Sequence, residues 1–289
     1  MLRSLDLRNV GPSDQLTIEF GDRLNVITGD SGLGKSFLLD VAWWALTRSW
    51  AAGQALPNRG AEREATLSYR IDGKTAPVEA DIDFSVQRQG WFHDSGRPPI
   101  SGLVVYARVD GSFTVMDPAR NDPPDDEGDS PAYRRRPTAF FFNSDEVWNG
   151  LVKGEQQLCC GLIADWRVWK LQSSEEFKAL ENMLRGEPPA EQVTLLIDDV
   201  EAHLHPRWQR AILPAILQAL QGLGASAGSQ VISTTHSPLV LASLEGLWEE
   251  KHDRLFRLDL VSSNESAPHV ELKQEEWRPL SRHPAKVAG

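Results

Sequence analysis

The sequence predicts an α/β fold in which a mainly parallel sheet is flanked by helices and an antiparallel β lobe is inserted in the middle. Apolar strands alternate with helical segments towards both ends of the chain, as in sheets covered by helices on both faces. Between these ends, short strands joined at Asp72-Gly73 and Asp110-Gly111 indicate antiparallel hairpins. The 289 residues contain no internal repeat and no heptad run, which excludes solenoids and long coiled coils.

We expect a single composite domain over residues 1–289. Residues 1–60 and 138–289 are assigned to the core and 61–137 to the antiparallel insertion, with a flexible loop near 117–137 where an acidic block precedes a basic one. Apolar residues wrap around the helix expected at 35–50, and the strand at 138–143 is expected to be buried. Further helices are expected at 155–169, 174–184 and 206–223. The other strands are expected at 2–10, 16–20, 24–28, 65–71, 77–84, 103–109, 112–116, 193–197, 230–235, 255–261 and 269–272.

Composition and charge limit the classes of function. Lys and Arg number 30 against 41 Asp and Glu, a formal charge of −11, which argues against a protein that coats nucleic acid by bulk charge. No apolar stretch is long enough to span a membrane, and the first residues lack the apolar core of a signal peptide. The two cysteines, Cys159 and Cys160, are adjacent and fit a reducing compartment. We therefore expect a cytoplasmic protein.

A phosphate-binding loop lies between the third expected strand and the first helix. The segment matches G-x-x-x-x-G-K-[ST] at every position, with residues Gly29, Asp30, Ser31, Gly32, Leu33, Gly34, Lys35 and Ser36. Glycines allow successive backbone N–H groups to face a phosphate at a helix N-terminus. Lys35 is predicted to contact the β and γ phosphates and Ser36 to ligate Mg²⁺. The alternative, a glycine-rich turn without function, would have to match the motif and its context by chance.

A second acidic site follows the apolar strand at 193–197. It ends in Asp198 and Asp199, which a buried strand delivers to the sheet edge where ligands bind in α/β folds. Asp198 is predicted to hold Mg²⁺ and Asp199 to polarise the attacking water. The alternative is that both residues cap the following turn.

Two histidine segments follow. His203 and His205 form an H-x-H pair without a neighbouring third ligand, so a subunit interface is favoured over zinc. The strand at 230–235 runs into His236-Ser237-Pro238, and His236 is predicted to act as a hydrogen-bonding switch beside the γ-phosphate. The alternative is a capping Ser237 beside a passive histidine.

Together these segments resemble the ATP-binding-cassette class of ATPases, and within it the stand-alone branch related to RecF, SMC and OLD-type proteins, often called AAA-type ATP-binding proteins. The resemblance rests on the strand and phosphate loop at 25–36, on LLIDDVEAHLHP at 195–206 and on TTHSPLVL at 234–241. It implies a P-loop NTPase fold of ABC-ATPase type. It also implies a head-to-tail homodimer that sandwiches two ATP molecules with Mg²⁺ and a D-loop interface containing His203 and His205. Glu201, on the same connection as Asp199, is a further candidate catalytic residue, which would position the attacking water if Asp199 does not.

The sequence departs from this family in the acidic strand end and in the signature motif. Asp199 stands where the family has glutamate, and its shorter side chain predicts slow hydrolysis. Val200 replaces the usual proline. The segment 151–155, which includes Gly154 and Glu155, is the candidate signature motif, with Gly154 opening the following helix towards a γ-phosphate. Asn143 is the candidate glutamine-loop residue.

The sequence therefore predicts an ATP-hydrolysing switch that dimerises and controls a separate effector in DNA repair, genome maintenance or anti-phage defence. The alternatives are a hydrolysis-poor, ATP-locked scaffold and a direct DNA-binding ATPase, with Arg134-Arg135-Arg136 as its contact. No membrane partner is expected. Trp43 and Trp44 are expected to lie in the core. The core is also favoured for Trp148, Trp166 and Trp169, and the alternative for these three is a surface that docks a partner.

Overall fold

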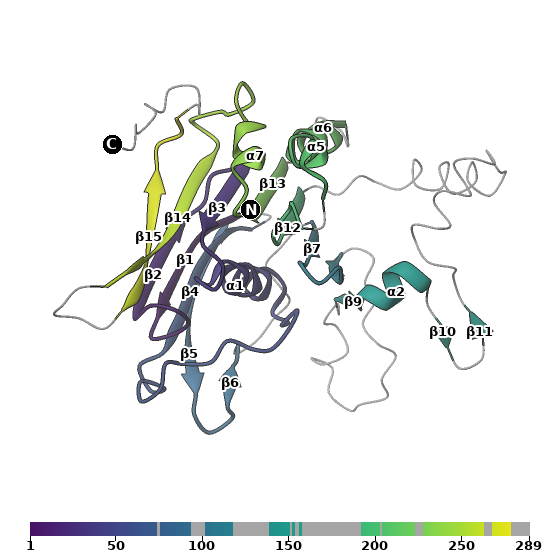
Figure 1. Cartoon of the computed structure of the whole chain (residues 1–289). Coiled ribbons are helices and arrows are strands. Elements are labelled where there is room, and N and C mark those ends of the chain that lie inside the picture. Colours follow the sequence, from purple (N-terminus) through teal and green to yellow (C-terminus); the bar gives the residue numbers. More distant parts are fainter. Residues whose placement is uncertain are drawn as a thin grey trace.

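The computed structural model describes ten stretches of the chain, namely residues 1–73, 76–93, 102–117, 139–150, 152–153, 156–157, 192–202, 204–222, 228–262 and 268–278. They form two main sheets and a small hairpin (Figure 1). The candidate signature residues Gly154 and Glu155, and also His203, lie outside the described residues. So do the expected helix at 174–184, the arginines at 134–136, both cysteines, Trp166 and Trp169.

The larger sheet has eight strands in the order β15-β14-β3-β13-β12-β7-β8-β9. Strands β14, β3, β13, β12 and β7 are all parallel to their neighbours in this run, and β15, β8 and β9 add antiparallel edges. These eight strands are β3 (Leu24–Gly29), β7 (Leu103–Ala107), β8 (Phe113–Met116), β9 (Phe140–Phe142), β12 (Gln192–Ile197), β13 (Gly228–Thr235), β14 (Arg254–Val261) and β15 (His269–Glu275). The predicted mainly parallel sheet is confirmed.

The second sheet is antiparallel, in the order β2-β1-β4-β5-β6. Its strands are β1 (Leu2–Arg8), β2 (Gln15–Glu19), β4 (Thr66–Asp72), β5 (Pro77–Ser85) and β6 (Gly90–Trp91). The first two strands of the chain therefore pair with the middle segment, whereas β7 and β8 belong to the parallel sheet. The predicted division into a core of 1–60 and 138–289 and an insertion of 61–137 is wrong in this respect, because strand pairing across the chain decides sheet membership.

Helix α1 (Lys35–Thr47) and the antiparallel sheet cover one face of the parallel sheet (Figure 1). Ile27 of β3 packs into this cluster with Trp43 and Trp44, all fully or almost fully buried, as predicted for the helix and its tryptophans. Val26, the neighbour of Ile27, points to the opposite face, as alternation along a strand requires. There it packs against α6 (Ile212–Gly222) and α7 (Pro238–Ala242).

Three predicted elements differ from the structure. The helix expected at 206–223 is divided into α5 (Pro206–Gln209) and α6, because Pro214 has no N–H to bond the carbonyl of Arg210. The strand expected to be buried at 138–143 is β9, on the sheet edge, where Phe140 and Phe141 are exposed. In the stretch expected to be helical from 155, Gln156–Gln157 instead forms β11, paired with β10 (Val152–Lys153).

Trp148 was expected in the core but is 60% exposed on α2 (Ser144–Asn149). No residue of α2 is buried, so this helix does not bring Trp148 into the core. Among the described residues, no helix is both long and apolar enough to cross a membrane.

Candidate functional site

Four segments with functional side chains meet at one edge of the parallel sheet. In the registers, Thr28 of β3 is beside Thr235 of β13, and Ile197 of β12 is beside both Ser233 of β13 and Ala107 of β7. These strands run in the same direction, so their carboxyl ends share an edge. The phosphate loop, His236, the Asp198-Asp199 pair and Arg108 each follow one of these ends directly. The edge thus brings together residues up to 208 positions apart, from 28 to 236.

The phosphate loop at 29–36 joins β3 to α1 and is built on glycine geometry. Gly29, Gly32 and Gly34 have φ of 140°, 83° and 96°, in the region that favours glycine. A Cβ on Gly29 would lie 2.6 Å from the Leu258 carbonyl oxygen, and one on Gly34 would lie 2.8 Å from Pro12 Cγ. At Gly32 nothing lies within 4 Å of such a position, so the loop opens outward there. A backbone of this shape can bring N–H groups close to phosphate oxygens.

Lys35 is the buried cation of this loop, although it is the first residue of α1. Its side chain folds back, so that Nζ donates to the carbonyl oxygens of Gly29 at 2.9 Å and Asp30 at 3.1 Å. The residue is only 5% exposed, whereas the neighbouring Ser36 is exposed. The ammonium group therefore lies over the inner surface of the loop, where a phosphate would bind, and the Ser36 hydroxyl is accessible to a metal.

The Asp198-Asp199 pair is fixed by Thr234, the next-to-last residue of β13. The Thr234 hydroxyl donates to Asp198 Oδ1 at 2.8 Å and accepts from the Asp199 N–H at 2.7 Å. The Asp198 N–H in turn donates to the Ala107 carbonyl at 2.9 Å. Asp198 is 5% exposed, and Asp199 turns the chain in the left-handed region, with φ of 44°. Asp198 is thus fixed at the end of β12, whereas the carboxylate of Asp199 lies beside His236.

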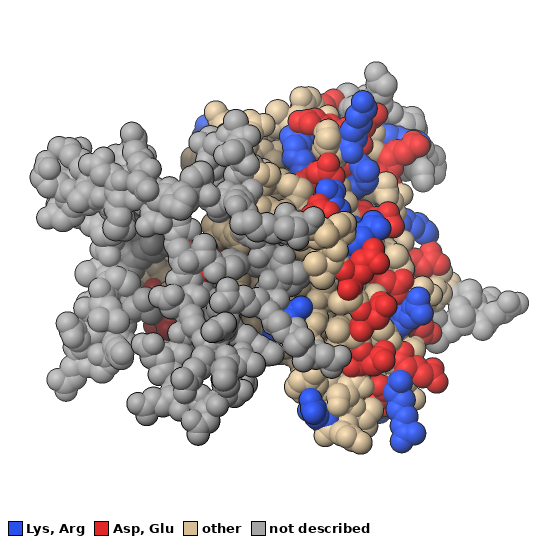
Figure 2. All heavy atoms as spheres, turned by 180° about the vertical axis from the view of Figure 1, so that it is seen from behind, with Lys and Arg blue, Asp and Glu red and all other residues tan. Residues whose placement is uncertain are grey.

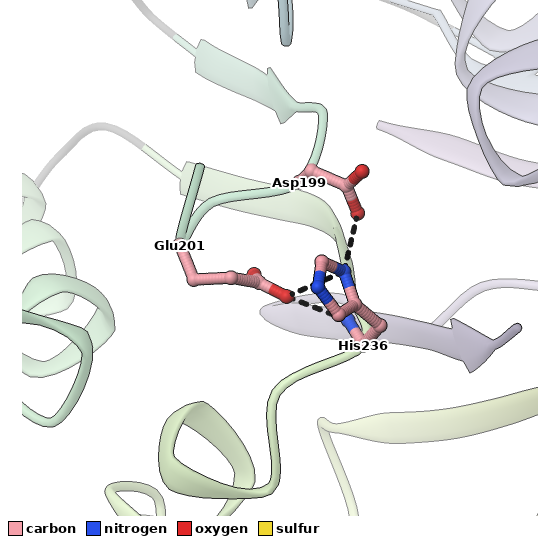
Figure 3. A group of neighbouring side chains, drawn as sticks. All are labelled: Asp199, Glu201 and His236. Atoms are coloured by element: carbon pink, nitrogen blue, oxygen red, sulfur yellow. Dashed lines mark hydrogen bonds and ion pairs between the residues drawn. The ribbon is translucent and has the colours of Figure 1, made fainter. Parts of the chain in front are cut away.

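Asp199, Glu201 and His236 form the next group (Figure 3). Glu201 is 3% exposed, and its two oxygens accept hydrogen bonds at 2.7 Å, from the Thr235 hydroxyl and from the His236 N–H. His236 Nδ1 lies 3.1 Å from Glu201 Oε1 and 3.4 Å from Asp199 Oδ1. The two carboxylates therefore orient the ring on its Nδ1 side, which leaves Nε2 on the other side of a half-exposed side chain.

These side chains fit ATP with Mg²⁺ better than a transition metal. Ser36 and Asp198 offer the oxygen ligands that Mg²⁺ prefers, at the sheet edge that holds the phosphate loop. Asp199, Glu201 and His236 also offer ligand atoms within 4.8 Å of one another. Both Glu201 oxygens, however, already accept hydrogen bonds, one from the Thr235 hydroxyl and one from the His236 backbone N–H. We therefore assign Glu201 a positioning role.

Two further predicted residues serve as helix caps. His205 is exposed and accepts a hydrogen bond from the Arg207 N–H at the start of α5. Asn143 and Glu146 form a reciprocal capping box at the start of α2. Asn143 follows β9, three strands from β12 in the sheet order, whereas Arg108 follows the strand directly beside β12.

Sequence reasoning missed three residues at this edge: Thr234, Arg108 and Asp40. Thr234 could have been found from its position in the segment TTHSP, because a hydroxyl two residues before the histidine can reach the end of the neighbouring strand. The position of Arg108 depends on β7 joining the parallel sheet, which the sequence did not indicate. Asp40 lies on the buried helix α1 among apolar neighbours, which is itself a signal of function or of an unusual pKa.

Burial raises the pKa of the Asp40 carboxyl above its usual 3.8, and the negative charges of Asp198 and Asp110 raise it further, against the opposing charge of Arg108. The neighbouring Tyr106 hydroxyl also acts against the rise in the pKa of Asp40, and burial raises the pKa of Tyr106 itself. The charged form of Asp40 is therefore disfavoured in the folded protein.

Replacing Asp40 with asparagine should remove the free-energy cost of holding a charged carboxylate at this position, and this cost depends on pH. A carboxyl whose pKa is raised by folding contributes stability below the unfolded pKa, and loses it as pH rises through the folded pKa. Asparagine does not titrate, so the melting temperature of Asp40→Asn relative to the wild type should increase from pH 4 upward. Calorimetry across pH 4–8 measures the difference, with Asp81→Asn, an exposed site on β5, as the control for losing one charge. A difference that does not change with pH would refute the assignment.

Replacing Glu201 with glutamine should destabilise the turn that holds His236. One acceptor oxygen becomes an NH₂ group that faces a donor, which costs about 1–3 kcal/mol for the buried group left unsatisfied. Denaturant unfolding measures the loss. Glu79→Gln, at an exposed position of β5, is the control. A loss no larger than that of the control would show that the contacts of Glu201 do not contribute to stability.

Two stretches of the chain match known sequence families. Residues 4–121 match the family described as "AAA domain", and residues 184–242 match the one described as "AAA domain, putative AbiEii toxin, Type IV TA system". The curated protein "Retron Ec83 probable ATPase" of Escherichia coli is 34% identical over 65 residues, which are 22% of this chain and 11% of that protein. The chain thus matches only a small part of that relative.

Solved structures of similar outline share little sequence with the chain. The SMC head domain from Thermotoga maritima is 15% identical with a TM-score of 0.44, and covers 96% of this chain and 99% of its own. The recombination mediator protein RecF bound to an ATP analogue is 11% identical with a TM-score of 0.43, and covers 89% and 95%.

The two family matches contain the residues that meet at the sheet edge. The first includes the phosphate loop and Arg108, and the second includes Asp198, Asp199, Glu201 and His236. These residues therefore lie within the two segments that are similar to AAA domains.

Proposed function

We propose that the chain is an ATP-binding and hydrolysing molecular switch that dimerises head-to-tail around ATP and controls a separate effector. The observation that carries the proposal is the phosphate loop, with its buried Lys35 ammonium, on the same sheet edge as Asp198, Asp199 and His236. A phosphate cradle, a carboxylate for a metal and a base for water are the parts that nucleoside triphosphate hydrolysis needs.

In this proposal the loop at 29–36 holds the phosphates and Lys35 exchanges its loop carbonyls for the β and γ phosphate oxygens. Ser36 and Asp198 hold Mg²⁺, which when bound neutralises charge on the phosphates. Asp199 polarises the attacking water, and His236, oriented by Glu201, hydrogen-bonds near the γ-phosphate. Asp199 is one methylene shorter than glutamate, so the position of the water has to adapt.

Dimerisation is proposed because several groups at this edge face outward. The His236 side chain is 54% exposed, and Trp208 on α5, just after His205, is 66% exposed. An exposed tryptophan beside a candidate interface loop is a typical anchor for a protein partner. A second copy placed head-to-tail would cover both the nucleotide and this surface.

The effector is proposed to act in anti-phage defence, genome maintenance or DNA repair. The description of one matched family includes a type IV toxin–antitoxin system, and the Escherichia coli relative carries the name of a retron. These names support defence as the first pathway to test.

An ATP-locked scaffold is the second candidate function. The Asp199 carboxylate lies 3.4 Å from His236 Nδ1, and this contact competes with the holding of a water molecule. The third candidate, direct binding to DNA, has less support in the described residues. Figure 2 shows a face on which acidic and basic side chains are interspersed, and β5 presents Glu79, Asp81 and Asp83 outward.

The test is phosphate release from ATP with Mg²⁺ over a wide range of protein concentration. Lys35→Ala serves as the blank, and Lys273→Ala, an exposed lysine on β15, is the matched control. Specific activity that rises with concentration would support composite sites in a dimeric ATPase. ATP binding without release above the blank would favour the scaffold, and the absence of binding would refute the nucleotide site.

A further inference from the structure

Arg108 lies at the carboxyl-end edge of the parallel sheet, beside the candidate site, and the proposed function gives it no role. It follows the carboxyl end of β7, and β7 lies parallel and directly beside β12. The hydrogen bond from the Asp198 N–H to the Ala107 carbonyl fixes the two strand ends to each other at 2.9 Å. Arg108 and Asp198 thus emerge side by side from adjacent strands.

The surroundings of Arg108 place it on the side of the sheet where α1 begins. Two residues before it, the Tyr106 ring lies 6.2 Å from the Trp43 ring of α1, so this face of β7 is turned to that helix. Burial raises the pKa of Asp40, and the positive charge of Arg108 partly opposes this rise. Asp40 lies five residues, or about 7.5 Å of helix rise, beyond Lys35. Arg108 therefore lies near both the acidic strand end and the helix that carries the phosphate loop.

The guanidinium group of Arg108 has few partners. Its side chain is 26% exposed, and among the described residues its one polar contact is an ion pair of 3.7 Å with Asp110, itself 55% exposed. An arginine carries five N–H donors, and one long ion pair leaves most of them available to another anion. A long contact to an exposed carboxylate is easily exchanged for a better anion.

The backbone at Arg108, in contrast, is firmly held. Its N–H donates to the Ser112 carbonyl at 2.9 Å, and its carbonyl accepts from the Gly111 N–H at 3.0 Å. Asp110 Oδ1 closes the same turn by accepting from the Ser112 N–H at 2.9 Å. The tight turn fixes where the side chain starts, while the guanidinium group can change partners.

We propose that Arg108 contacts the terminal phosphate of the nucleotide held by the phosphate loop of the same chain, and that Asp110 is its partner in the absence of nucleotide. The inference rests on the proposed function. A planar guanidinium group binds two phosphate oxygens at once, which an ammonium group does not. Charge that develops on the terminal phosphate during hydrolysis would be stabilised by the same contact.

The test compares ATP and ADP, because only ATP carries the terminal phosphate. Affinities of Arg108→Gln for both nucleotides with Mg²⁺ are measured by calorimetry, together with phosphate release. We expect ATP affinity to fall about tenfold or more, ADP affinity to remain within about threefold and turnover to fall by about a hundredfold. Arg108→Lys should recover part of the ATP affinity. Arg70→Gln, on the exposed face of β4, is the matched control and should change neither affinity.

Equal losses of ATP and ADP affinity, or no loss of either, would overturn the proposal. Wild-type protein that binds neither nucleotide would refute the proposed function instead, so the two failures can be told apart. Asp110→Asn provides an independent test if Arg108→Gln does not fold. It keeps the oxygen that caps the turn but removes the negative charge, and it should raise the ratio of ATP to ADP affinity. An unchanged or lowered ratio would contradict the role of Asp110 as the resting partner.

Discussion

Replacing Lys35 with alanine is expected to abolish tight ATP binding and leave the fold intact. The Lys35 ammonium now donates to two loop carbonyls, and in the nucleotide complex it would donate to phosphate oxygens instead. Hydrogen bonds to charged groups contribute about 1.5–3 kcal/mol each, so losing two of them weakens binding by a hundredfold or more, at about 1.4 kcal/mol per tenfold. Calorimetric titration with ATP and Mg²⁺ measures the effect.

The control for this prediction is stability. Lys35 is the first residue of α1, and alanine is favourable in a helix, so the unfolding midpoint should change little. Lys273→Ala should retain wild-type affinity, because Lys273 pairs with Glu271 on β15. If folded Lys35→Ala binds ATP as tightly as the wild type, the loop at 29–36 is not the phosphate site.

Replacing Asp199 with asparagine is expected to stop hydrolysis while ATP binding persists. A positioned general base contributes about 10²–10⁴-fold to a rate, and an amide cannot accept the proton. The Asp199 N–H keeps its bond to the Thr234 hydroxyl in the variant, since that bond comes from the backbone. Single-turnover phosphate release measures the loss, and size-exclusion chromatography with ATP measures the longer-lived dimer.

Comparing Glu201→Gln with Asp199→Asn distinguishes a general base from a residue that only positions His236. If Asp199 is the base, Asp199→Asn removes turnover at unchanged stability, whereas Glu201→Gln lowers stability and turnover together through His236. Turnover that survives in Asp199→Asn would mean that another group positions the water. Asp199→Glu adds the missing methylene, and faster release in that variant would identify side-chain length as the cause of slow hydrolysis.

Local motifs were sufficient to predict the strands and the first helix of the phosphate site. The match at 29–36 specifies a turn that only glycine geometry allows, and the structure has positive φ at Gly29, Gly32 and Gly34. The apolar run before Asp198 likewise predicted a buried parallel strand with carboxylates at its end, because such a run suits a strand covered on both faces.

What the sequence did not predict depends on contacts between distant residues. Strand β7 was assigned to the antiparallel lobe because it forms a hairpin with β8, but its other edge pairs in parallel with β12, ninety residues later. Arg108 was therefore missed. The exposure of Phe140 on β9 was missed for a related reason, since three consecutive phenylalanines indicate a strand but do not tell whether it lies at an edge.

The place of β3 in the sheet has a consequence for synthesis of the chain. This strand carries the phosphate loop and is the first strand of the larger sheet to be synthesised, but its two neighbours in that sheet, β13 and β14, are more than two hundred residues further along. A nascent chain emerging from the ribosome therefore holds the loop without the strands that flank it, and pairing over such separations is slow. Nucleotide affinity would then arise only after β13 and β14 have left the ribosome. Until then, the apolar face of β3 would be a substrate for chaperones, and a ribosome that stalled before residue 228 would release a product without an ATP site.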